Sequence, residues 1–199
     1  MRADPYHPPV LELSAGEARR IALRAQGLLG APDRRAGVPG VLRSLGAVQL
    51  DTISVIARSH ELVPFARLGA IGRAAVAEAY WAPPFAAFEY WAHAACVLPI
   101  EDWPWCAYRR RKAWTYDGWQ RVASDATFSD VRARLADSPN GLTASDLGGA
   151  KNGGQWWDWS EVKVALERLL HFGEVVCVER RGWKRVYRLA ADVVPRPLL

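Results

Sequence analysis

The last third of the chain carries the pattern that most restricts its fold, three helix signals in a row followed by a hairpin signal. A helix is predicted over residues 129–136, before a turn rich in Pro, Asn and Gly. A second, short helix is expected over residues 142–147, with Thr143 as its N-cap. Ser160 is a favourable N-cap for a third helix that runs through Phe172.

The hairpin signal follows the third helix directly. Residues 174–180 are typical of a strand, Arg181 and Gly182 of a tight turn, and residues 183–189 of the returning strand. Three helices followed by a hairpin is the order of a winged-helix domain. We therefore predict that the third helix is the DNA-recognition element and that the hairpin is a wing. A winged helix that serves protein contacts or structural packing is the alternative.

Basic side chains predict where such a domain would meet DNA. The residues expected to contact DNA are Lys163, Arg180, Arg181, Lys184, Arg185 and, upstream, Arg58. A net charge of +5, from 26 Lys and Arg against 21 Asp and Glu, favours nucleic-acid or acidic partners. The excess is small, and high arginine content also accompanies GC-rich genomes, so charge alone does not decide the partner. A basic run at residues 109–112 lies among aromatic residues, which fits either a nucleic-acid surface or a solvated helix face.

The upstream part of the chain is expected to be mainly helical. Ser14 and Glu17 form a capping-box signal for a helix near the N-terminus. Further helices are expected at residues 38–45 and 73–81, and the aromatic stretch 85–99 is expected to be buried. A length of 199 residues suits two small domains.

Several function classes are disfavoured by composition. No apolar run approaches the roughly 20 residues that span a bilayer, and residues 1–9 contain an acid and three prolines where a signal peptide needs an apolar core. We expect a cytoplasmic protein that does not enter the membrane. Cys96, Cys106 and Cys177 lack any Cys-x-x-Cys spacing, which predicts buried thiols, and the four scattered histidines predict no metal site.

An amide and a carboxylate stand two residues apart at Gln49 and Asp51. In an extended backbone they would point to one side, while Val48 and Leu50 would point into the core. A carboxylate on the working face of a protein that binds a polyanion repels phosphate, so it needs a chemical role or a structural one. The structural alternative is that Asp51 caps a helix beginning at Thr52.

Motifs in order through almost the whole chain resemble one protein family. They are residues 13–14 with 18–20, residues 25–28, Val-Gln-Leu-Asp at 48–51, Arg-Ser-His-Glu-Leu at 58–62, Glu-Tyr-Trp-Ala-His-Ala at 89–94, Trp-Trp-Asp-Trp at 156–159 and residues 182–187. The family is that of the crosslink-repair DNA glycosylases of the YcaQ and AlkZ type, which are tandem winged-helix proteins. The resemblance implies an α+β, mostly helical fold with two tandem winged-helix units. The first would span residues 1–120, and the second, with the basic wing, residues 121–199.

The resemblance also implies a role for the polar pair. Family members carry a catalytic Gln-x-Asp or Gln-x-Gln pair in the first unit, and this pair falls on Gln49 and Asp51. The sequence looks like the Gln-x-Asp branch, which is associated with broad removal of alkylated bases and unhooking of DNA interstrand crosslinks. Such enzymes are monofunctional and need no metal or organic cofactor, so the implied partner is double-stranded DNA with alkylated bases or crosslinks. Family members are longer and have a third winged helix. We therefore expect this chain to correspond to their N-terminal half. We also expect it to act as a monomer.

The chemistry suits one amide and one carboxylate. Cleavage of an N-glycosidic bond develops positive charge on the deoxyribose, and N-alkylation already makes the base a good leaving group. Asp51 would stabilise the oxocarbenium-like sugar and accept a proton from a water that Gln49 holds. The rival hypotheses are a non-enzymatic winged-helix DNA-binding protein, such as a transcriptional regulator, and an inactive relative that keeps the fold.

Three more polar residues have two interpretations each. His60 and His93 could orient a neighbour or contact DNA, or they could be hydrogen-bonded members of the core. Glu89, inside an aromatic run, is a reserve catalytic candidate, but its expected role is structural.

Overall fold

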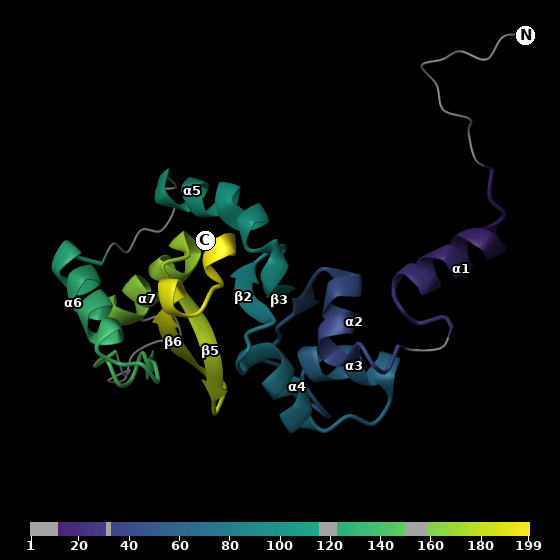
Figure 1. Cartoon of the computed structure of the whole chain (residues 1–199), viewed down its shortest axis with the longest axis horizontal. Helices are drawn as coiled ribbons and strands as arrows, with labels where there is room; N and C mark the ends of the chain where they lie inside the picture. The colour runs from purple at the N-terminus through teal and green to yellow at the C-terminus, as the bar shows by residue number, and fades with distance from the viewer. Residues whose placement is uncertain (1–11, 31–32, 116–122, 150–158) are drawn as a thin grey trace, which may run out of the picture.

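The computed structural model describes residues 12–30, 33–115, 123–149 and 159–199. Within these ranges the chain forms seven α-helices and two three-stranded antiparallel sheets (Figure 1). The predicted α+β class is therefore confirmed.

The upstream sheet and its helices follow the winged-helix order. Their elements are α2 (Gly37–Leu45), β1 (Val48–Gln49), α3 (Ser59–Leu68), α4 (Arg73–Trp81), β2 (Ala87–Trp91) and β3 (Ala95–Pro99). The order in the sheet is β1-β3-β2, so the short first strand pairs with the second strand of the hairpin. The helices pack on the sheet through buried side chains such as Leu42, Val76 and Tyr80.

The downstream elements follow the same order except that one described helix, and not two, lies between the first and second strands. They are α6 (Asp125–Ala136), β4 (Leu142–Thr143), α7 (Glu161–Phe172), β5 (Val175–Arg181) and β6 (Lys184–Leu189). The sheet order β4-β6-β5 matches that of the upstream sheet. Both parts are consistent with winged-helix units. The predicted boundary near residue 120 lies outside the described residues and stays a prediction.

The prediction of a helix over residues 142–147 is wrong beyond its first turn. The Thr143 hydroxyl accepts the backbone N–H of Asp146 at 3.2 Å, and the Asp146 carboxylate accepts the N–H of Thr143 at 2.8 Å. This reciprocal pattern is that of a helix start. Gly148, with a φ of 83°, ends the turn at once, so residues 142–149 form no helix.

The turn of the downstream hairpin lies one residue later than predicted. Arg181 pairs with Lys184, and the two turn residues are Gly182 and Trp183, with φ values of 52° and 70°. Two positive φ values are typical of a type I′ turn, whose twist suits antiparallel strands. A positive φ is unfavourable for a bulky residue. The Trp183 ring is held by stacking on the His60 ring, with centroids 5.3 Å apart.

The downstream hairpin packs against the upstream sheet, where β5 and β2 lie side by side (Figure 1). Val176 and Val178 of β5 share a buried cluster with Phe88 and Tyr90 of β2. Cys177, between the two valines, packs into the core formed with α2 and α4. The two sheets therefore share buried apolar side chains.

The remaining helices differ in how they contact this core. Helix α1 (Ala15–Ala25) has the predicted capping box but no buried residue, and it extends away from the sheets (Figure 1). Helix α5 (Ala107–Thr115) packs on α7. Four 3-10 helices complete the described part: Ile100–Asp102, Pro104–Cys106, Ala190–Asp192 and Arg196–Leu198. No described helix is long and apolar enough to cross a membrane.

Candidate active site at the edge of the first sheet

Strand β1 places Gln49 and Asp51 on one side of the upstream sheet. Val48 and Leu50 are 2% and 8% exposed, whereas Gln49 is exposed and Asp51 is half-buried. Beyond the last paired residue, the Leu50 N–H still donates to the Ala95 carbonyl at 2.8 Å. This bond keeps the chain extended, so the predicted alternation of side chains is confirmed.

The carboxylate of Asp51 is only partly used by the fold. Its Oδ1 accepts the backbone N–H of Ile53 at 2.9 Å, which forms an Asx turn. No helix begins at Thr52, because the next helix, α3, begins at Ser59. The helix-capping alternative is therefore wrong. Within the described part of the chain, no side chain or backbone group bonds to Oδ2.

Ser59 forms hydrogen bonds with the backbone of both polar residues, although the sequence did not identify it as a site residue. Its hydroxyl donates to the backbone carbonyl of Gln49 at 2.6 Å and accepts the backbone N–H of Asp51 at 3.1 Å. Its sequence signals are its place in the Arg-Ser-His motif and its suitability as a helix start, and α3 does begin at Ser59. That motif does not reveal a contact with residues eight and ten positions upstream.

His93 reaches Gln49 from the turn between β2 and β3. Its Nε2 lies 3.2 Å from Oε1 of Gln49, so with a proton on Nε2 it donates to the side-chain carbonyl. The Cys96 Sγ lies 4.0 Å from the other ring nitrogen, Nδ1. The carbonyl end of the Gln49 amide is thereby occupied. Its NH2 end has no hydrogen-bond partner among the described residues.

His60, in contrast, is a core histidine. It is 4% exposed and lies edge-on to Trp81, with ring centroids 5.4 Å apart. Burial lowers the pKa of His60 to about 4, and its Nδ1 has no hydrogen-bond partner. Among the described residues, no group of three or more His, Cys, Asp or Glu side chains could hold a metal ion.

Two of the hairpin arginines predicted to contact DNA are buried. Arg180 donates to both carboxylate oxygens of Glu89 at 2.7 Å, and Arg185 donates to Oε2 at 2.8 Å. Their side chains are only 10% and 13% exposed. Burial alone would raise the pKa of Glu89, but Arg185 and Arg180 outweigh burial and lower it to about 2. Glu89 therefore has the expected structural role, and both arginines join the hairpin to β2 instead of forming an exposed wing surface.

Helix α7 packs one face into the core. Six of its twelve residues are buried. Lys163 forms an ion pair with Glu167, which also accepts hydrogen bonds from Arg185 at 2.8 Å and from the Tyr187 hydroxyl at 3.2 Å. The face that carries Lys163 thus turns toward the hairpin, and contact of Lys163 with DNA stays a prediction.

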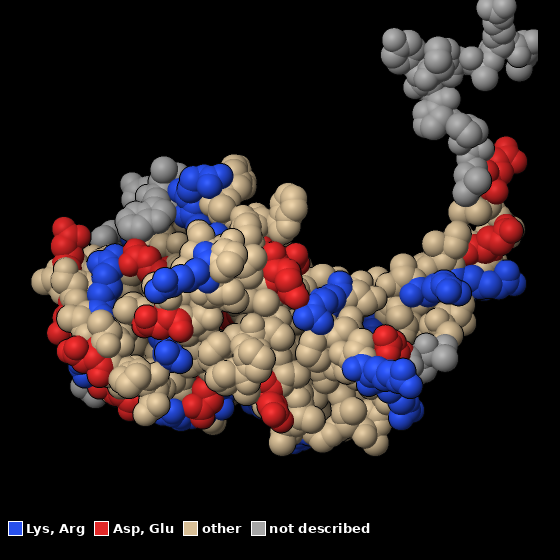
Figure 2. Space-filling view, in the orientation of Figure 1, with Lys and Arg blue, Asp and Glu red and all other residues tan. Residues whose placement is uncertain are grey.

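The other three predicted DNA contacts differ in exposure. Arg181 and Lys184 are exposed beside the hairpin turn, where Arg181 pairs with Glu179 at 2.8 Å. Arg58 is half-buried, with its guanidinium 4.1 Å from the centroid of the Trp183 ring. Figure 2 shows Lys and Arg interspersed with Asp and Glu on the side of the molecule that is in view. Residues 156–158 of the Trp-Trp-Asp-Trp motif lie outside the described residues.

Fold and site together define an α+β protein of winged-helix units with an amide and a carboxylate at the edge of its first sheet. Residues 42–198 match the family described as DNA glycosylase AlkZ-like. This stretch includes both sheets and the Gln49 and Asp51 pair. The chain therefore belongs to the AlkZ-like DNA glycosylase family. No solved structure matches the chain.

Proposed function

We propose that the protein is a monofunctional DNA glycosylase of the Gln-x-Asp type, which hydrolyses the N-glycosidic bond of alkylated bases in double-stranded DNA. The observation that carries this proposal is the state of the Asp51 carboxylate. One oxygen is fixed by the Ile53 N–H, and the other has no partner in the described part of the chain. In a member of a DNA glycosylase family, a carboxylate fixed in place but still open is suited to the reaction.

The reaction needs a negative charge and an oriented water. As the bond between C1′ and the base nitrogen breaks, the base leaves with the electron pair and positive charge develops on the sugar. The open oxygen of Asp51 stabilises this charge and accepts the proton of the water whose oxygen bonds to C1′. The Gln49 amide, whose carbonyl is bound to His93, positions that water. An N-alkylated base is cationic and leaves as a neutral molecule, so no second carboxylate is required.

A loop of exposed apolar side chains beside the site supports a role on duplex DNA. Ile53, Val55 and Ile56 are 69%, 91% and 83% exposed. Arg73 holds this loop, because its Nη2 donates to the Ile56 carbonyl at 2.8 Å. Enzymes that act on a base extrude it from the stack, and apolar side chains inserted between base steps are a common means of unstacking DNA. We assign this role to the loop.

Product analysis on a duplex that contains 7-methylguanine tests the proposal. We expect wild-type protein to release the free base and leave an abasic site in an unbroken strand. Asp51→Asn should release none, because the amide carries no charge and is a poor base. Asp192→Asn, the same substitution at an exposed aspartate outside the site, should behave as wild type. A wild-type protein that releases no base would refute the proposal.

Unhooking of crosslinks is the finer part of the proposal. A crosslinked base is an N-alkylated base whose substituent is tethered to the other strand, so the same bond breaks. The same assay on a crosslinked duplex should give two separable strands. If 7-methylguanine is released while the crosslink stays intact, the activity is confined to single-strand adducts.

The alternative is DNA binding without reaction, for which the exposed Arg181 and Lys184 beside the hairpin turn would be sufficient cations. This alternative requires a sequence preference over random DNA at matched salt concentration. It also requires that neither wild-type protein nor Asp51→Asn release a base.

A further inference from the structure

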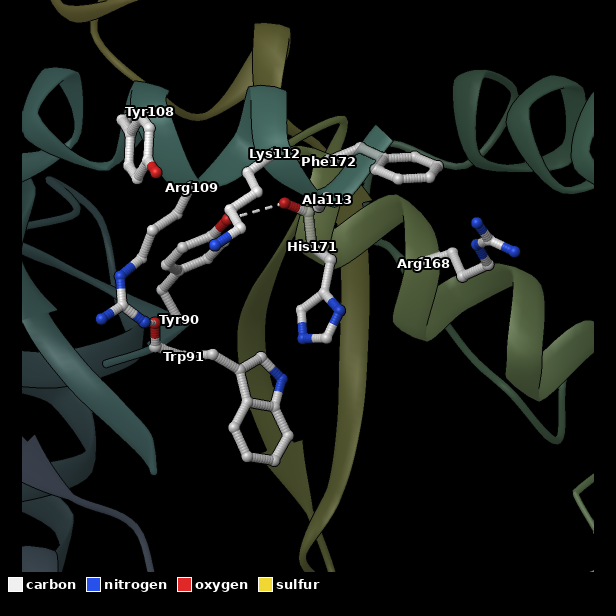
Figure 3. A pocket seen from close by; sticks show the side chains of 9 residues that line it. All are labelled: Tyr90, Trp91, Tyr108, Arg109, Lys112, Ala113, Arg168, His171 and Phe172. Atoms are coloured by element: carbon white, nitrogen blue, oxygen red, sulfur yellow. Dashed lines mark hydrogen bonds between the residues drawn. The ribbon is translucent and has the colours of Figure 1, made fainter. Parts of the chain in front are cut away.

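A cavity of about 400 Å³ lies between β2, α5 and α7 (Figure 3). Its volume falls within the range of about 300–1,000 Å³ that is typical of small-ligand sites. The side chains that matter for recognition are Trp91 from β2, Tyr108, Arg109 and Lys112 from α5, and Arg168 and His171 from α7.

The lining combines cations with exposed aromatic rings. Arg109, Lys112 and Arg168 supply positive charge, and none of the described lining residues is an Asp or a Glu. Trp91 is 38% exposed and Tyr108 is 64% exposed, although large aromatic side chains are usually buried. This combination fits a ligand that has both a flat ring and a negative charge.

Contacts between the three elements hold the cavity in shape. One guanidinium nitrogen of Arg109 donates to the carbonyls of Trp91 and Ala92 at 3.1 and 2.7 Å. The Tyr90 hydroxyl donates to the His171 carbonyl at 2.7 Å, as Figure 3 shows. The His171 ring lies edge-on to the Trp91 ring, with centroids 5.7 Å apart.

The turn between β2 and β3 connects this cavity with the candidate active site. Trp91 lines the cavity, and His93, two residues further along the chain, binds the side chain of Gln49. A ligand that moves Trp91 would therefore act on the same turn that holds Gln49.

We propose that the cavity binds one unpaired nucleotide of a DNA strand, with its base stacked on Trp91 and its phosphate paired with Arg168 and Lys112. The proposal takes the identity of the partner from the proposed function. A cavity of about 400 Å³ is large enough for a single nucleotide. Base extrusion creates unpaired nucleotides, and stacking on an aromatic ring accepts any base.

Binding of two oligomers of equal length tests this proposal. One is oligodeoxythymidylate, and the other is a strand of abasic sites with the same number of phosphates. We expect wild-type protein to bind the thymidine strand at least about fivefold more tightly, the lower range for stacking of a base on an aromatic ring. Trp91→Ala should abolish this difference. Trp105→Ala, which removes an 83% exposed tryptophan outside the cavity, should retain it.

A matched pair of arginines tests the phosphate contact. Arg168→Ala should weaken binding of both strands. It should also reduce the slope of the logarithm of the binding constant against the logarithm of salt concentration by about one. Arg111→Ala, at an exposed position of α5 outside the cavity, should have the smaller effect. Thermal unfolding verifies that each variant is folded. If Trp91→Ala does not fold, Tyr108→Ala provides a second variant that removes an exposed ring of the cavity.

Three results would overturn the proposal. They are equal binding of the two strands by wild-type protein, equal losses in the two tryptophan variants, and displacement of the strand by free thymidine monophosphate at the same nucleotide concentration. The last result would assign the cavity to free nucleotides. Because neither strand contains an alkylated base, a protein that shows base-dependent binding but releases no alkylated base would overturn the proposed function and leave this inference standing.

Discussion

At the scale of single residues, Ser59 fixes the backbone on both sides of Leu50. Its hydroxyl bonds to Gln49 and Asp51, and each lost hydrogen bond costs about 0.5–1.5 kcal/mol. We expect Ser59→Ala to slow base release about tenfold, because a shift of the two side chains weakens transition-state contacts. The single-turnover rate measures this effect. Ser129→Ala is the control, since Ser129 of α6 is exposed, lies outside the site and has no side-chain hydrogen bond to a described residue. An unchanged rate in Ser59→Ala would contradict the positioning role.

His60 gives the fold a dependence on pH. Burial lowers the pKa of His60 to about 4 from 6.5, so the folded state disfavours the protonated form. The stability contribution is complete above pH 6.5 and is lost as pH falls toward 4. We expect a slope of up to about 1.4 kcal/mol per pH unit in this window, the value for one proton. Denaturant unfolding should show that His60→Phe, which keeps a ring beside Trp183, loses this slope. A slope that persists in the variant would assign the titration to another group.

At the scale of elements, the contact between β2 and the downstream hairpin depends on one buried carboxylate. Glu89→Gln leaves Arg180 and Arg185 buried without their full counter-charge, and breaking a buried ion pair costs about 3–5 kcal/mol. We expect a loss of that order in the free energy of unfolding. The exposed pair of Arg43 and Glu101 is the control, and Glu101→Gln should cost less than about 1 kcal/mol. Equal losses in the free energy of unfolding of both variants would show that the buried pair stabilises the fold no more than a surface pair does.

The loop after Asp51 provides a second test at this scale. Val55 is 91% exposed, so Val55→Ser removes little buried area and should leave the unfolding midpoint unchanged. If the loop fills the space of an extruded base, the variant should release 7-methylguanine at least about tenfold more slowly, since lost stacking or insertion contacts are worth about 1–3 kcal/mol. Ile21→Ser, at a 54% exposed position of α1, should release the base at the wild-type rate. Similar rates in all three proteins would exclude insertion by Val55.

At the scale of the whole molecule, the sequence predicted local features well and contacts between distant segments poorly. The caps at Ser14 and Ser160 and the bounds of α4 depend on neighbours within a few residues, and all are confirmed. The pairing of Arg180 with Glu89 joins residues 91 positions apart. Whether an arginine is solvated or buried against a carboxylate depends on such contacts between distant segments. The sequence does not show these contacts, so it predicted Arg180 and Arg185 as exposed cations of the wing.

The candidate site also combines features that the sequence predicted with contacts that it did not. The alternation around Gln49 follows from two-residue periodicity, which the sequence displays. Its partners Ser59 and His93 lie on α3 and on the β2–β3 turn, and only the folded sheet brings them together. The residues for the proposed chemistry could thus be named from the sequence, but the groups that position them could not.

The central claim is that the open carboxylate of Asp51 acts in the reaction and not in the binding of DNA. The most direct measurement is the single-turnover rate of 7-methylguanine release at saturating protein, for wild type and Asp51→Asn, together with the Kd of each for the same duplex. We expect the rate to fall by about 10²–10⁴, the range for a lost general base or charge-stabilising group, while the variant binds the duplex no more weakly. An Asp51→Asn protein that binds the duplex and releases the base at the wild-type rate would contradict the claim.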